Sequence, residues 1–144
     1  MAGAIVEHSL GRAILSRLRD MTDSEQDSLL DGNGHGALAT FSTKIWVGYG
    51  LNLYGQGVRA DLLAVKKVRN KFAHEDRHLD FRDPEIERIC ERLQAPRYLA
   101  ETEMRPERTA AKERYLDTIH HFAAGFSICA RTPQRPGALG LFLF

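Results

Sequence analysis

The stretch that decides the fold spans residues 58–74 and reads VRADLLAVKKVRNKFAH. Its apolar side chains recur at four- and three-residue steps, at Val58, Leu62, Val65, Val68 and Phe72. At 3.6 residues per turn, this spacing places all five on one side of an α-helix. We therefore expect a helix through about Ala73 that buries this face, with Phe72 among the core residues.

The rest of the chain repeats the helical spacing and nowhere sustains a strict apolar–polar alternation. Further helices are expected over residues 3–19, 22–32, 42–55, 83–96 and 106–130. The sequence thus predicts an all-α fold, a bundle of five or six helices in a single domain over residues 1–130. The prolines and glycines of residues 131–144 predict an irregular tail.

Local signals set several of these boundaries. Thr22 and Glu25 form a capping-box pattern, and Asp83 followed by Pro84 supplies a cap and a first-turn proline. Ser42 is a candidate cap for the third helix, and Pro96 is expected to close the fifth. The Gly-rich residues 32–36 predict a plain connector, because the preceding strand and the Gly-Lys-Ser/Thr of a phosphate-binding loop are missing.

Composition narrows the classes of function. The 144 residues include 20 Lys and Arg against 19 Asp and Glu, so the net charge of +1 gives no general attraction for nucleic acid or acidic membranes. With 43% hydrophobic residues, the chain can bury a core without disulfides or a metal, and Cys90 and Cys129 are expected to be reduced core residues. No basic leader and no uncharged membrane-length run is seen, so we expect a cytoplasmic protein without membrane contact.

A concentrated basic surface lies on the outer side of the 58–73 helix. Lys66, Lys67 and Lys71 alternate with the buried positions, and such a patch suits contact with phosphate groups or with a partner. Nucleic acid is therefore a possible ligand of this patch. The alternative is a solvated face that pairs with the acidic residues 20–31 of the same or another subunit.

Arg69, Asn70 and His74 carry the sharpest chemical hypothesis. A neutral His74 can take the proton of a ribose 2′-hydroxyl, Arg69 can stabilise charge on the phosphate, and Asn70 can orient either group. Such a ribonuclease would need no metal. However, Arg69 and His74 are separated by about 140° around the helix, so a second subunit or an unwound helix end must bring them together. The structural alternative pairs Arg69 with Asp80 or Asp83 and leaves His74 at the helix end.

The remaining candidates favour packing. His74 and His78 have metal-compatible spacing, but no second motif supports them, and we expect neither a metal nor another cofactor. Of the consecutive His120 and His121, one should pack and one should be exposed. Trp46 and the nearby Tyr49 predict core or dimer packing. Together with the apolar residues 139–144 of the tail, they give more hydrophobic surface than the short early helices can cover, so we expect a homodimer.

Three ordered blocks of the sequence resemble the mannitol repressor family of bacteria. They are residues 38–45, residues 60–62 leading into 68–74, and residues 79–86, and the resemblance covers about residues 4–130. It implies an all-α, dimeric domain that regulates sugar-alcohol uptake. No helix-turn-helix is evident, so such a transcriptional regulator or co-regulator would act through a protein partner.

The string from Arg69 to His74 also resembles the Arg-x4-His signature of the broader HEPN superfamily, which includes metal-independent endoribonucleases of toxin and defence systems. Two hypotheses therefore stand. The first is a non-catalytic regulator, supported by three blocks, and the second is an endoribonuclease, supported by Arg69, Asn70 and His74.

Overall fold

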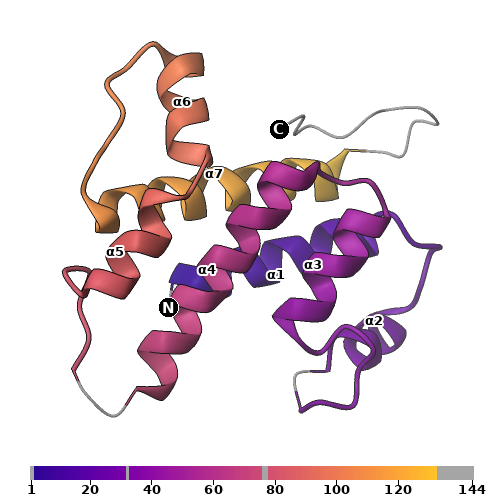
Figure 1. Ribbon diagram of the computed structural model, residues 1–144. Coiled ribbons are helices and arrows are strands. Elements are labelled where there is room, and N and C mark those ends of the chain that lie inside the picture. The colour runs from indigo at the N-terminus through magenta and orange to yellow at the C-terminus, as the bar shows by residue number, and fades with distance from the viewer. Residues whose placement is uncertain (1, 32, 76–77, 133–144) are drawn as a thin grey trace.

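The computed structural model describes residues 2–31, 33–75 and 78–132, and over these ranges the chain is entirely helices and loops (Figure 1). The helices are α1 (Ala2–Leu15), α2 (Asp23–Leu30), α3 (Phe41–Gly50), α4 (Gln56–His74), α5 (Pro84–Glu91), α6 (Ala95–Glu103) and α7 (Ala111–Arg131). The predicted all-α single domain is confirmed, and the seven helices within these ranges exceed the expected five or six. None of them is long and apolar enough to cross a bilayer. The expected tail lies outside the described residues from position 133 onward.

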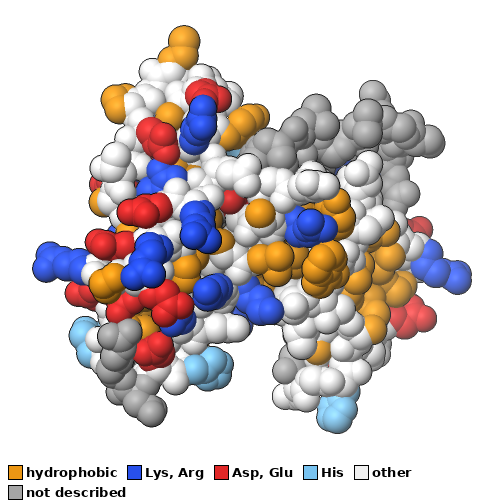
Figure 2. Space-filling view, viewed as in Figure 1, with side chains coloured by type: hydrophobic (Ala, Val, Ile, Leu, Met, Phe, Trp, Pro, Cys, Tyr) orange, Lys and Arg blue, Asp and Glu red, His pale blue; other side chains and the backbone are white. Residues whose placement is uncertain are grey.

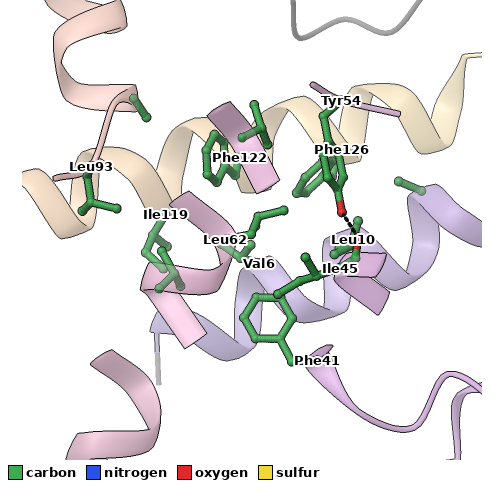
Figure 3. Close-up of a cluster of buried hydrophobic side chains, with 14 of the residues drawn as sticks. Val6, Leu10, Phe41, Ile45, Tyr54, Leu62, Leu93, Ile119, Phe122 and Phe126 are labelled. Atoms are coloured by element: carbon green, nitrogen blue, oxygen red, sulfur yellow. Dashed lines mark hydrogen bonds between the residues drawn. The ribbon is translucent and has the colours of Figure 1, made fainter. Parts of the chain in front are cut away.

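The long helices form the centre of the domain. α1 packs along α7, α3 packs on α1, and α4 crosses next to α3, while α5 and α6 rest against α7 (Figure 1). Phe122 and Phe126 of α7 meet Leu10 of α1, Ile45 of α3 and Leu62 of α4 in a fully buried cluster (Figure 3). Side chains from widely separated segments thus share one core.

The predicted caps are confirmed at two helix starts. The Thr22 side chain accepts a hydrogen bond from the Glu25 amide, and the Glu25 carboxylate accepts one from the Thr22 amide at 2.8 Å. Asp83 Oδ1 accepts from the Glu85 amide at 3.0 Å. The expected cap at Ser42 is wrong, because Thr40 Oγ1 accepts from the Thr43 amide and begins α3 earlier. The buried Phe41 fixes that start.

The additional helix is α6, where Pro96 was expected to end a helix. Pro96 instead lies in the first turn, where its missing amide costs nothing because first-turn amides have no partner within the helix. Three other helices are shorter than the sequence predicted. α1 ends at Leu15, α3 ends at Gly50, and α7 begins at Ala111.

A close approach of α3 to the core requires a glycine at position 48. The Tyr54 hydroxyl donates a hydrogen bond to the Ile45 carbonyl at 2.7 Å (Figure 3). A Cβ on Gly48 would lie 2.7 Å from that hydroxyl oxygen, whereas one on Gly50 would meet open space. Packing therefore requires a glycine at position 48 but not at position 50.

Candidate functional site

α4 carries the sequence-predicted site, and its buried side sets where the other side chains point. Val58, Leu62, Val65 and Val68 are fully buried, as predicted. The expectation that Phe72 belongs to the core is wrong, since it is 39% exposed. Phe72 lies in the last turn of α4, and its ring packs at a tilt against the ring of Phe81, with ring centroids 5.1 Å apart.

Arg69 is held by an ion pair with Glu7 of α1, and not by either of the carboxylates expected from the sequence. Lys44 of α3 donates to the other Glu7 oxygen at 2.8 Å, so Glu7 joins three helices. Burial raises the pKa of Glu7, but the hydrogen bonds and charges of Lys44 and Arg69 outweigh it and leave that pKa below 4.5. The carboxylates predicted to pair with Arg69 instead accept hydrogen bonds from nearby backbone amides. Asp80 accepts from the Arg82 amide, and Asp83 caps α5.

The structure does not join Arg69, Asn70 and His74 in one site. His74 is exposed at the last position of α4 and Asn70 is also exposed, and within the described residues neither side chain bonds to Arg69. The Arg69 guanidinium instead lies toward α1 and over the Phe41 ring, 5.8 Å from its centroid. This arrangement matches the angular separation expected from the helix.

The three lysines of the basic surface already have partners. Lys66 donates to the Ser42 hydroxyl at 3.2 Å, Lys71 contacts Glu85 at 2.6 Å, and Lys67 lies 3.7 Å from the same Glu85. Lys71 also pairs with Glu75 at 3.2 Å. Within this chain the acidic partners come from α5 and the end of α4, so pairing with residues 20–31 of the same chain is wrong. These pairs reduce the free positive charge that a phosphate would meet.

A mainly apolar pocket of about 430 Å³ lies beside Arg69. Its walls include Phe72, Phe81 and Tyr115, whose rings form a continuous row, with Phe81 5.4 Å from Tyr115. Arg69, with its side chain 40% exposed, provides the cation at the rim. The pocket offers an aromatic wall and one partly neutralised charge.

An exposed aromatic surface lies on α3 and the start of α4. Trp46 is 54% exposed, and its ring meets Tyr49 edge-on at 6.5 Å. The Arg59 guanidinium lies 5.0 Å from the Trp46 ring centroid and 4.2 Å from that of Tyr49. Figure 2 shows hydrophobic side chains gathered around a basic one over these helices. Core packing of Trp46 is therefore excluded, and its role in a dimer stays a prediction.

Besides Lys44, two further buried charged groups escaped the sequence analysis. Asp61 is 1% exposed and accepts from the Gln94 amide at 2.9 Å and the Ala95 amide at 2.8 Å, which caps α6. Arg114, 7% exposed, donates to the carbonyl oxygens of Cys90 at 2.9 Å, Glu91 at 3.1 Å and Leu93 at 2.7 Å at the end of α5. Burial raises the pKa of Asp61 to about 6, against the lowering effect of its amide hydrogen bonds.

A signal for Asp61 was present in the sequence. It follows Val58 by three positions and precedes Val65 by four, which places a carboxylate on the apolar side of the helix. A charge at such a position implies a buried partner. The partner itself, 33 residues later, could not be read from spacing.

The consecutive histidines behave as predicted. His120 is exposed, whereas His121 is partly buried between Tyr98, at 5.7 Å, and Phe122, at 5.8 Å. Burial lowers the pKa of His121. Across the described parts of the chain, no three His, Cys, Asp or Glu side chains cluster as a metal would require.

Comparison with protein-family models, with curated proteins and with solved structures finds no match to this chain. Function is therefore inferred from the geometry of the chain and from the sequence resemblance.

Proposed function

We propose that the chain is a non-catalytic regulatory domain that acts through protein contact. The observation that carries this proposal is the exposed Trp46, grouped with the partly buried Tyr49 and Arg59. Trp, Tyr and Arg are the residues that most often dominate binding energy at protein interfaces. Here the guanidinium already lies against both rings, so little side-chain freedom is left to lose on binding.

The proposed partner of this surface is a second copy of the chain. No described segment of the same chain fully covers the aromatic side chains of Trp46 and Tyr49. In a two-fold symmetric dimer, this surface of one chain would pack against the same surface of the second chain. The resemblance of residues 38–45, 60–62 with 68–74, and 79–86 to the mannitol repressor family supports a dimeric co-regulator of sugar-alcohol uptake in bacteria. A further protein would connect such a dimer to transcription.

Self-association of purified protein tests the contact surface. Sedimentation velocity at about 1–50 µM, a range that covers ordinary weak homodimers, should show a dimer for the wild type. Trp46→Ala should weaken dimerisation about a hundredfold, as expected for a central interface tryptophan. Tyr98→Ala removes an aromatic side chain that is 38% exposed on α6 and serves as the control. A monomeric wild type, or equal loss in both variants, would reject this surface.

A second candidate function is metal-independent endoribonuclease activity. The observation that favours it is the pocket beside Arg69, whose aromatic row suits stacking of an unpaired base. In this alternative a second subunit brings His74 toward the partner's cleft as general base, while Arg69 stabilises the phosphate and Asn70 orients it. The Arg69 pair with Glu7 opposes this role, because a guanidinium bound to a carboxylate has less charge to offer a phosphate.

Incubation with single-stranded RNA and a metal chelator separates the two functions. The regulatory proposal expects no cleavage above the background of His74→Ala. If the wild type cuts RNA and leaves 2′,3′-cyclic phosphate ends while His74→Ala does not, the chain is a nuclease and the regulatory proposal fails.

A further inference from the structure

A second pocket, of about 620 Å³, lies between α4 and α5 on the opposite side of α4 from the Arg69 contacts. Its volume is in the range of small-molecule sites. Leu63 and Ala64 of α4 and Ile89 of α5, all partly buried, supply apolar lining. Arg88 of α5 and Arg92, which directly follows the last residue of α5, line the same pocket and are both exposed.

The two arginines are the unusual part of this pocket. They stand four residues apart, so they lie on one side of α5 and repel each other. Within the described residues, neither guanidinium takes part in a hydrogen bond or an ion pair, whereas Arg69, Arg105 and Arg114 all have carboxylate partners. An anion placed between Arg88 and Arg92 would relieve that repulsion.

The acidic groups of the pocket do not supply that anion. Asp61 is 1% exposed, and its oxygens are directed to the amides of Gln94 and Ala95. Glu85 contacts Lys71 at 2.6 Å and Lys67 at 3.7 Å. Figure 2 shows basic and acidic side chains crowded together over α4 and α5. Both carboxylates are thus already engaged, and neither forms an ion pair with Arg88 or Arg92.

We propose that this pocket binds a small phosphomonoester whose apolar body lies on Leu63, Ala64 and Ile89. A phosphate monoester carries up to two negative charges near neutral pH, which matches two arginines. A guanidinium group binds phosphate oxygens through paired N–H donors, and two guanidinium groups can bind the same phosphate. The apolar lining contributes affinity that inorganic phosphate cannot gain. None of Trp46, Tyr49 and Arg59, which form the proposed dimer surface, lines this pocket.

Phenyl phosphate is the direct probe, because it joins an apolar ring to a phosphate. Calorimetric titration at low salt and about pH 7.5, where the second phosphate proton with pKa about 6 is lost, should show saturable binding to the full chain. Inorganic phosphate and benzoate should each bind about tenfold more weakly, since each lacks one half of the recognised chemistry.

Variants assign the binding to this pocket. Arg88→Gln and Arg92→Gln keep a polar stem but remove the charge, and each should weaken phenyl phosphate binding about tenfold or more. Arg97→Gln removes an arginine that is 76% exposed on α6 and should leave binding unchanged. Circular dichroism verifies that all three variants fold. Absent binding, equal affinity for inorganic phosphate, or equal loss in Arg97→Gln would overturn the proposal.

Discussion

Replacing Asp61 by Asn should change how the stability of this protein depends on pH. The carboxyl group is buried, and its pKa is raised from the ordinary value of 3.8 to about 6. The folded chain therefore holds this proton more tightly than the unfolded chain does. The resulting stability is fully present below about pH 4 and is lost as the pH rises through about 6.

The size of the effect follows from that difference. A gap of about two pH units, at about 1.4 kcal/mol for each unit, corresponds to about 3 kcal/mol of unfolding free energy. Asn has nearly the shape of a protonated Asp and carries no charge at any pH. Any loss from its poorer acceptance of the Gln94 and Ala95 amides is constant with pH and cancels in the comparison.

Urea denaturation followed by circular dichroism at several pH values between about 4 and 7 measures the difference. The stability of Asp61→Asn relative to wild type should rise by about 3 kcal/mol across this range. Asp20→Asn removes an exposed carboxylate outside the helices and controls for net charge. A difference for Asp61→Asn that stays flat, or that falls, would show that the amide hydrogen bonds dominate over burial.

Three further substitutions test other contacts by the same measurement. Glu7→Gln should lower the free energy of unfolding by about 2 kcal/mol near neutral pH, because Lys44 is then buried without its carboxylate. This loss of stability should shrink as the pH falls through the lowered pKa of Glu7. A loss that does not change with pH would refute the ion pair. Gly48→Ala should cost about 1–3 kcal/mol because its Cβ would meet a buried tyrosine ring; the matched Gly50→Ala should be neutral or stabilising by up to about 1 kcal/mol, and equal effects would contradict the close approach. Phe72→Ala should cost about 2 kcal/mol, less than the 3–5 kcal/mol typical of a fully buried phenylalanine, and a larger loss would show that the side chain is buried in solution.

Several features of the fold could be predicted because they depend on neighbours along the chain. The capping box of Thr22 and Glu25 and the cap at Asp83 need only residues within one turn. The apolar spacing from Val58 to Val68 identified the buried side of α4 without knowledge of what covers it. Whether a segment forms a helix, and which side of that helix is apolar, both depend on residues within a few positions. The all-α fold could therefore be predicted from the sequence.

The candidate site was less predictable, because its contacts join distant segments. The basic stretch of α4 was identified, but its charges are neutralised by Glu7, 62 positions before Arg69, and by Glu85 of α5. Sequence spacing offered Asp80 and Asp83 as nearer partners. It carries no information on which helix end lies beside which carboxylate.

The sequence by itself determined the helical class, the inward side of the main helix and two caps, since backbone geometry relates residues three and four apart. Only the tertiary structure decided that Asp61 caps α6 at Ala95, just before Pro96, that Phe72 stays partly exposed and that Trp46 faces outward. The physical reason is that burial and ion pairing depend on distances between segments, which packing of the whole chain sets.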